Sequence, residues 1–188
     1  RRVRCSNLEY AEIFSSKGKG TRTGKWQPPK PDEIKINLDG ASIPGSYFCG
    51  WRAVVRDASG QVIAARAGRQ EQTQDAFGAE IQAMAGAVAL AADIGAVRVT
   101  FETDSQLVAE AMDIQEIDSA PYAVIIEDIK FQLKLWFARH RVSLCSRNEN
   151  AVAHELGQIG RRCLSGACMD WETIVPPSVA ACVLGDMP

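Results

Sequence analysis

Two segments of this chain alternate apolar and polar residues and end in an aspartate. In residues 34–39, isoleucine and leucine alternate with polar side chains up to Asp39, and in residues 97–104, valine and phenylalanine do so up to Asp104. Successive side chains of a strand point to opposite faces of its sheet. Both segments are therefore predicted to be strands that carry an acid on the face opposite their apolar packing.

A third acid, Glu80, lies in a segment with helical periodicity, residues 75–94. The apolar stripe of this predicted helix consists of Phe77, Ile81, Met84 and Val88. Glu80 is three residues from Phe77 and four from Met84, so it borders the buried stripe. A carboxylate in that position needs a cation or hydrogen-bond donors to offset its desolvation. Either a metal ion supplies the charge, or Glu80 pairs with an arginine or extends into solvent.

The remaining periodicity predicts an α/β domain. The expected strands are residues 33–40, 48–56, 61–69, 97–103 and 140–146, with a hairpin turn at 57–60. The expected helices are residues 75–94, 105–113, 121–138 and 150–162, and Pro121 is favourable in a first helical turn. The apolar stripe of the 121–138 helix is expected to be Val124 or Ile125, Ile129, Leu133 and Trp136. At 188 residues and 46% hydrophobic, the chain is long enough for one domain with a real core and tails.

The ends of the chain have a different composition. Residues 1–25 are polar and rich in glycine and lysine, which is typical of a flexible linker or tail. Because Arg1 is not an initiator methionine, we expect the chain to be part of a larger protein.

The six cysteines do not form a recognisable disulfide or zinc pattern. The chain has no signal-like start, no glycosylation sequon and no Cys-x-x-Cys pair, so we expect reduced thiols in the cytoplasm or nucleus. Only His140 and His154 could complete a zinc site. The alanine-rich residues 83–97 are interrupted by Asp93 and too short for a membrane span, so we expect a buried helix and no membrane partner.

Several phrases of the chain, in their order and spacing, resemble one known family. They are residues 37–41 (Asn-Leu-Asp-Gly-Ala), 55–60 (Val-Arg-Asp-Ala-Ser-Gly), 79–83 (Ala-Glu-Ile-Gln-Ala), 102–105 (Glu-Thr-Asp-Ser) and 150–156 (Asn-Ala-Val-Ala-His-Glu-Leu). Together they resemble the ribonuclease H-like domains of plants, which are similar to the RNase H parts of retrotransposon reverse transcriptases. The resemblance runs from about Trp26 to about Arg162, and residues 171–186 are similar to the endings of that family.

The resemblance implies a ribonuclease H-like domain over residues 26–165 and a C-terminal extension over 166–188. Its fold would be a five-stranded mixed sheet flanked by helices. Its active site would use Mg²⁺, or Mn²⁺ in its place, to act on the RNA strand of an RNA/DNA hybrid. Asp39, Glu80 and Asp104 match the first three acidic metal ligands and so are the candidate catalytic residues. Two such ions, about 4 Å apart, would clamp the attacking water and the leaving oxygen.

Two positions depart from the family pattern. His154 stands where active members carry the fourth acid, and Leu144 stands where well-studied members carry a loop histidine. Imidazole suits softer transition ions better than Mg²⁺. His154 is therefore either a catalytic residue in the place of that acid, or a residue that caps or pairs with a neighbouring acid and binds no metal.

The charge of the chain is less favourable for nucleic-acid binding. Phosphate contacts depend on lysine and arginine, whereas the formal net charge is −2 and the sequence pI is 5.8. The candidate nucleic-acid contacts are Lys130, Lys134, Arg147 and Asn150. Lys130 and Lys134 are four apart on one helix face, which could be a phosphate track or simply a solvated face. Because residues 113–119 contain no basic insertion, we expect modest affinity for a hybrid.

Three functional hypotheses follow. The first is a ribonuclease H-like endonuclease that acts on RNA/DNA hybrids through Asp39, Glu80 and Asp104. The second is a domain that binds nucleic acid but has lost turnover. The third is a docking module for another protein within a larger chain. The three acids favour the first hypothesis, whereas His154, Leu144 and the acidic pI favour the other two.

Overall fold

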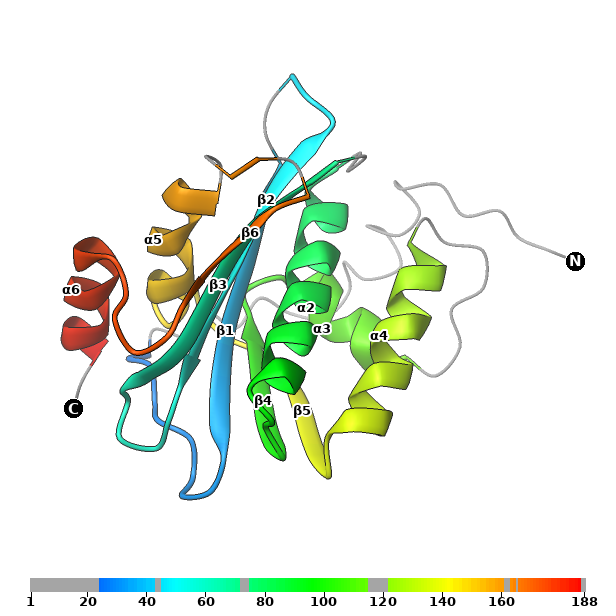
Figure 1. Ribbon diagram of the computed structural model, residues 1–188. Helices are drawn as coiled ribbons and strands as arrows, with labels where there is room; N and C mark the ends of the chain where they lie inside the picture. Colours follow the sequence, from blue (N-terminus) through cyan, green and yellow to red (C-terminus); the bar gives the residue numbers. More distant parts are fainter. Residues whose placement is uncertain are drawn as a thin grey trace, which may run out of the picture.

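A six-stranded mixed sheet forms the centre of the computed structural model (Figure 1). The structure describes residues 24–42, 45–71, 75–114, 122–160, 163–164 and 166–186, without the side chains of 158–160. The strands are β1 (Ile34–Ser42), β2 (Phe48–Arg56), β3 (Val62–Glu71), β4 (Arg98–Thr103), β5 (Arg139–Leu144) and β6 (Cys168–Trp171). Their order across the sheet is β5-β4-β1-β2-β3-β6. Most of the predicted tail, residues 1–23, lies outside the described residues.

The strand directions explain why two of the acids meet. β1 runs parallel to β4, with Leu38 opposite Thr103, and antiparallel to β2. Asp39 directly follows Leu38, and Asp104 directly follows Thr103. Because neighbouring parallel strands end at the same edge of a sheet, the two aspartates lie side by side.

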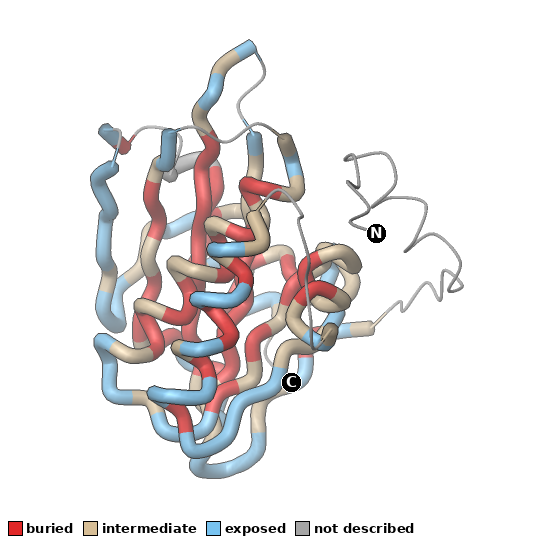
Figure 2. The backbone as a smooth tube through the Cα atoms, turned by 90° about the vertical axis from the view of Figure 1, so that its right-hand side faces the viewer, coloured by how far each residue is buried: buried red, intermediate tan, exposed pale blue. Residues whose placement is uncertain are grey.

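Helices cover both faces of the sheet (Figure 1). They are α2 (Ala76–Asp93), α3 (Gln106–Asp113), α4 (Ala123–Trp136), α5 (Ala151–Gly160) and α6 (Pro177–Asp186). α2, α3 and α4 pack on the larger core, which takes its sheet residues mainly from β1, β2 and β4. α5 and α6 cover the opposite face through a smaller core that contains Val54, Ala65, Leu156 and Val183. The buried parts of the strands and of α2 form a continuous interior (Figure 2).

The sixth strand comes from the region where the sequence predicts only an extension. β6 pairs antiparallel with β3, with Ala65 opposite Trp171, and adds one strand to the expected five. α6 then returns along the second face, where Val179 and Val183 are buried. The C-terminal segment therefore completes both the sheet and the smaller core.

On β1, the second face of the sheet is polar but not exposed. Lys35, Asn37 and Asp39 alternate with the core residues of β1 as predicted, yet all three are buried. Lys35 forms an ion pair with Glu102 at 2.8 Å, and Asn37 also hydrogen-bonds Glu102, at 3.2 Å. Buried polar groups that are bonded in this way avoid the cost of lost hydration.

The expected apolar stripe of α4 is only partly correct. Ile129 and Leu133 are buried as predicted, but Val124 is 84% exposed and Trp136 is 43% exposed. Ile125, the alternative to Val124, is partly buried and packs against the larger core, and Ile126 beside it is fully buried. α4 begins at Ala123, with Tyr122 in the left-handed region (φ 74°). The predicted helix start at Pro121 lies outside the described residues. The periodicity therefore predicted the helix correctly, but the predicted buried face differs from the observed one by part of a turn.

Two further expectations concern the cysteines and the membrane. Cys49, Cys145, Cys163, Cys168 and Cys182, the cysteines within the described ranges, are free thiols. Burial raises the pKa of the Cys145 thiol well above its ordinary value, which makes this group unreactive. None of the helices in the described part of the chain is both long and apolar enough to cross a bilayer.

Candidate metal centre

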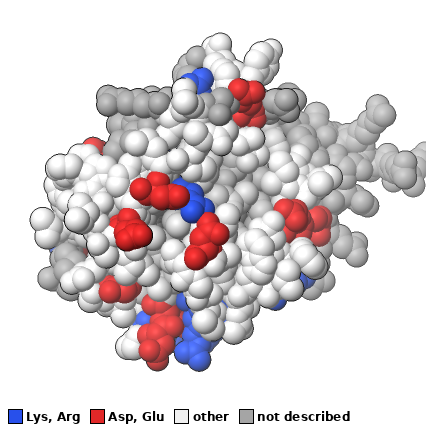
Figure 3. Space-filling model, viewed as in Figure 1, with Lys and Arg blue, Asp and Glu red and all other residues white. Residues whose placement is uncertain are grey.

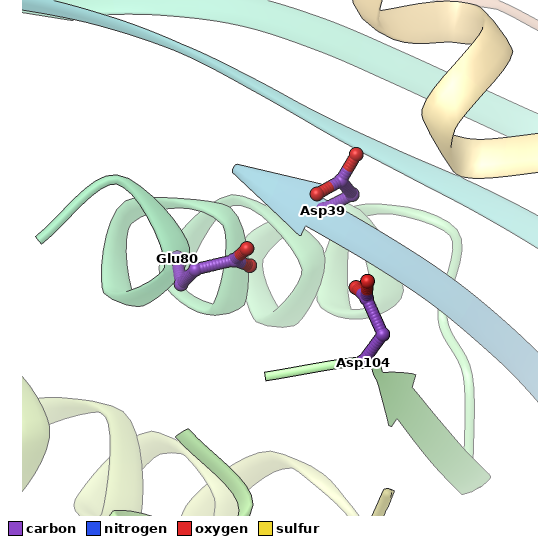
Figure 4. Close-up of side chains that lie close together, drawn as sticks. All are labelled: Asp39, Glu80 and Asp104. Carbon is purple, nitrogen blue, oxygen red and sulfur yellow. The ribbon is translucent and has the colours of Figure 1, made fainter. Parts of the chain in front are cut away.

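Three carboxylates from different elements converge at the carboxyl ends of β1 and β4. Asp39 comes from β1, Glu80 from α2 and Asp104 from the turn after β4. One oxygen from each of these side chains lies within 4.8 Å of the other two, and the three side chains point toward one another (Figure 4). The structure thus brings together the three acids that the sequence predicts as metal ligands.

Glu80 reaches the aspartates because α2 packs directly on the backbone of β1. Gly40 makes this approach feasible, since a Cβ atom at that position would lie 2.2 Å from the Ala79 carbonyl oxygen. The Gly40 N–H donates a hydrogen bond to Glu80 Oε2 at 3.1 Å. Asp75 caps α2 by accepting a hydrogen bond from the Gly78 N–H at 2.8 Å. Gly40 therefore sets both the depth of α2 and the position of the Glu80 carboxyl.

The Glu80 carboxyl lies in a largely buried environment next to two other acids. Burial raises the pKa of Glu80 to about 8, and the negative charges of Asp39 and Asp104 contribute to the same shift. At neutral pH, Glu80 therefore holds a proton in the metal-free protein. A divalent cation between the three groups would displace this proton and offset their repulsion. An all-oxygen donor set of this kind fits Mg²⁺ or Mn²⁺.

Asn150 fixes the position of Asp104. It is 1% exposed, and its amide donates to Asp104 Oδ1 and to the Leu38 carbonyl oxygen, both at 2.9 Å. It therefore holds a carboxylate in place, and its side chain is not presented to solvent as the predicted nucleic-acid contact would be. Arg147 is different, since its side chain is 94% exposed and its Nε lies 3.6 Å from Asp104 Oδ2. Arg147 is thus free to reach a phosphate beside the centre.

His154 lies against Asp39 at the rim of the centre. Its Nδ1 is 3.3 Å from Asp39 Oδ2, while its side chain is 80% exposed. This geometry matches the alternative in which His154 pairs with a neighbouring acid.

Arg52 of β2 contacts the centre, and this contact was not predicted from the sequence. It is 3% exposed, lies opposite Asp39 in the β1–β2 register, and its Nη2 donates to Asp39 Oδ2. The same Nη2 lies 3.5 Å from His154 Nδ1. The sequence contains one indication of this contact, an arginine among the otherwise apolar residues 48–55. A charge in a buried strand requires a counter-charge.

The two lysines predicted as a phosphate track lie in different environments. Lys130 is 9% exposed, and its Nζ donates to the Ile114 carbonyl oxygen and lies 3.5 Å from Glu127. Lys134 is exposed, and both lysines line a groove of about 990 Å³ between α3, α4 and β5. The groove also contains Glu110, Asp113 and Glu127, so its charge is mixed. Lys130 thus has a structural role that its spacing from Lys134 did not indicate.

Figure 3 shows the charges on one face of the molecule, and the modest hybrid affinity expected from the sequence stays a prediction. On the face viewed in Figure 3, acidic groups are scattered, and the described residues form no continuous band of lysine and arginine. Leu144, the residue in place of the family histidine, is the last residue of β5, is partly exposed and also lines the groove.

Solved structures of ribonucleases H have the same fold. The N-terminal RNase H domain of Rv2228c from Mycobacterium tuberculosis is 23% identical, with a TM-score of 0.60 over 68% of this chain and 92% of that one. RNase H1 from Halobacterium salinarum is 19% identical, with a TM-score of 0.58 over 69% of this chain and 97% of that one. LC11-RNase H1, solved in complex with an RNA/DNA hybrid, is 19% identical, with a TM-score of 0.60 over 67% of this chain and 94% of that one.

A comparison of the sequence with curated proteins gives no match. A family model does match. It is described as reverse transcriptase-like, and it matches residues 37–160, a range that includes all three carboxylates, Arg52 and His154. The ribonuclease H-like fold and this match, which covers more than half of the sequence, agree with each other, and the chain belongs to the reverse transcriptase-like family.

Proposed function

We propose that this domain binds RNA/DNA hybrids and cleaves their RNA strand with the help of a divalent metal ion. The observation that carries the proposal is the convergence of Asp39, Glu80 and Asp104 to within 4.8 Å at the ends of two parallel strands. The elevated pKa of Glu80 supports it, because a cluster of acids that must hold a proton at neutral pH has a strong tendency to bind a cation. The solved complex of LC11-RNase H1 with a hybrid supports the choice of substrate.

Each residue of the centre has a separate task in this proposal. Asp39, Glu80 and Asp104 would hold Mg²⁺ or Mn²⁺, and Glu80 would release its proton as the cation binds. When bound, the ion neutralises charge on a phosphodiester and lowers the pKa of the attacking water. Asn150 keeps Asp104 in position through its 2.9 Å hydrogen bond, and the exposed Arg147 offers its guanidinium to a neighbouring phosphate.

A second candidate is a domain that binds hybrids without cleaving them. The specific observation in its favour is the pair of nitrogen groups on Asp39, where Arg52 and His154 both contact Oδ2. A carboxylate that is already neutralised by a guanidinium has less charge to offer a metal ion. The two candidates share a binding surface and differ in turnover.

A cleavage assay on a hybrid with a labelled RNA strand separates these candidates. We expect slow endonucleolytic cleavage of the RNA strand in Mg²⁺ or Mn²⁺, and none in a chelator. Duplexes of DNA alone and of RNA alone are the matched substrates, and Asp39→Asn is the control protein. Binding without cleavage in either metal would establish the second candidate. Neither binding nor cleavage would leave the docking module as the better account.

A further inference from the structure

We propose that Arg52 takes the place of a second metal ion at Asp39, so that the centre holds one divalent ion rather than two. This inference rests on the proposed function, since it concerns the same three carboxylates. A pair of ions about 4 Å apart requires one carboxylate that binds both, with one oxygen toward each. Asp39 is the residue that would have to do so, because it lies between the other acids and α5.

The two oxygens of Asp39 are in different situations. One points toward Glu80 and the other points away from it (Figure 4). Oδ2 accepts a hydrogen bond from Arg52 Nη2 and lies 3.3 Å from His154 Nδ1. Among the contacts of the described residues, only Oδ1 is left for a cation. The side of Asp39 that would face a second ion is therefore already occupied by the Arg52 guanidinium and the His154 imidazole.

Arg52 is held there by the surrounding structure. Its register opposite Asp39 fixes the backbone, and its side chain is almost entirely buried beneath α5. Gly157 of α5 leaves the necessary room, because a Cβ atom at that position would lie 2.3 Å from Arg52 Cζ. Glycine inside a helix is less favourable than alanine. A helix that accepts this cost directly above the guanidinium indicates that the arginine has a fixed place in the fold.

The charges of the centre also favour a single ion. With all three carboxylates ionised, the acids contribute three negative charges and the Arg52 guanidinium contributes one positive charge. One divalent cation then balances the centre, whereas two would leave it with a net positive charge in a largely buried site. His154 adds no anionic group at the position where a fourth acid would offset this excess.

Electron paramagnetic resonance of Mn²⁺ tests the inference without relying on activity. Wild-type protein and Arg52→Gln are titrated with Mn²⁺, alone and with an excess of a short RNA/DNA hybrid, and are frozen directly after mixing. We expect the wild type to bind one isolated ion under both conditions. Arg52→Gln keeps a polar side chain of similar length but removes the charge. We expect it to bind two ions with the hybrid present, seen as a doubled stoichiometry and as magnetic coupling between neighbouring ions.

Two control variants, Arg52→Lys and Arg66→Ala, complete the experiment. Arg52→Lys retains the positive charge and should bind one ion, which separates charge from packing. Arg66→Ala removes an arginine of β3 that pairs with the exposed Asp93 and Asp170 and not with the carboxylate cluster, and it should behave like the wild type. Two coupled ions in the wild type, or one ion in both the wild type and Arg52→Gln with the hybrid present, would overturn the role of Arg52 but leave the metal centre standing. No bound Mn²⁺ in any folded variant would overturn the proposed function itself.

Discussion

Two arginines of β2 are buried on the same face of the sheet, and their surroundings differ. Arg56 is fully buried, donates to Asp186 Oδ2 at 2.7 Å and to Asn37 Oδ1 at 2.8 Å, and stacks 3.4 Å from the centre of the Trp26 ring. Arg52, four residues earlier, contacts Asp39 and lies 3.5 Å from His154. Both leave a buried Nε without a hydrogen-bond partner within the described structure.

The two arginines differ in the role of the acidic residue with which each forms an ion pair. Asp186 belongs to the C-terminal helix α6, so the Arg56 pair joins the end of the chain to the central strands. Asp39 belongs to the carboxylate cluster, so the Arg52 pair competes with a metal ion for the same side chain. One buried ion pair therefore serves the fold, and the other sets the charge of the candidate active site.

Removing the first arginine should have the largest effect. Arg56→Gln leaves Asp186 and Asn37 without their donor, and loss of one partner of a buried ion pair costs about 3–5 kcal/mol. We expect a value near 5 kcal/mol because the Trp26 contact is lost as well. Urea denaturation measures the change, and millimolar Mg²⁺ should not reverse it. Arg66→Ala is the control, with a smaller expected cost, because both acidic partners of Arg66, Asp93 and Asp170, are exposed.

Removing the second arginine should destabilise the metal-free protein less, by about 3 kcal/mol. Here the loss should be recovered in part by Mg²⁺, because a cation can then balance Asp39 from the vacated side. Mass action gives about 2.7 kcal/mol of stabilisation at a metal concentration 100 times the Kd. Denaturation of Arg52→Gln with and without Mg²⁺ checks this recovery. Equal responses of the Arg52 and Arg56 variants to Mg²⁺ would remove the distinction between the two arginines.

The pH dependence of stability should report on Glu80. Its pKa is raised from 4.5 to about 8, so between these values the folded state holds a proton that the unfolded state has released. Stability without metal is therefore greatest below the ordinary pKa and is lost progressively as the pH rises toward 8. Thermal denaturation at a series of pH values measures the fall. Glu80→Gln should remove most of it, and a profile that rises over this range would contradict the assignment.

The smallest effect is expected from His154→Asp. A new carboxylate at this position would lie close to the Arg52 guanidinium and pair with it, so Mg²⁺-dependent cleavage should change by no more than about twofold, or about 0.4 kcal/mol of barrier. Combined with Arg52→Gln, the same substitution should raise cleavage about tenfold, equivalent to about 1.4 kcal/mol. Rates at saturating metal separate chemistry from affinity. A tenfold gain in the single variant would show that Arg52 does not limit the centre.

The sequence predicted the three acids because their positions depend on local periodicity. Alternation placed Asp39 and Asp104 on the face opposite the core, and helical spacing placed Glu80 at the edge of a buried stripe. The parallel pairing of β1 and β4 then brought the strand ends together. Local pattern and fold class were sufficient for this part of the site.

The contacts that the sequence did not reveal depend on pairings between distant segments. Arg52 meets Asp39 only through the β1–β2 register, which the alternation within either strand does not predict. Lys130 was expected either in a phosphate track or on a solvated face, but the packing of α4 directs its Nζ to the Ile114 carbonyl oxygen. β6 has four residues, too few for alternation to stand out, and forms because the free edge of β3 offers backbone partners.

Calorimetric titration of the wild-type protein with Mg²⁺ and Mn²⁺ tests the central claim, that Asp39, Glu80 and Asp104 form a divalent metal centre. We expect a binding heat, an increase in melting temperature, and release of the Glu80 proton near neutral pH, seen as a dependence of the heat on the buffer. Asp39→Asn should weaken binding by more than about 100-fold, because even partners outside the ligand shell affect metal affinity 10–100-fold. Absence of heat and of any thermal shift at millimolar metal, in a wild-type protein with intact circular dichroism, would contradict the account.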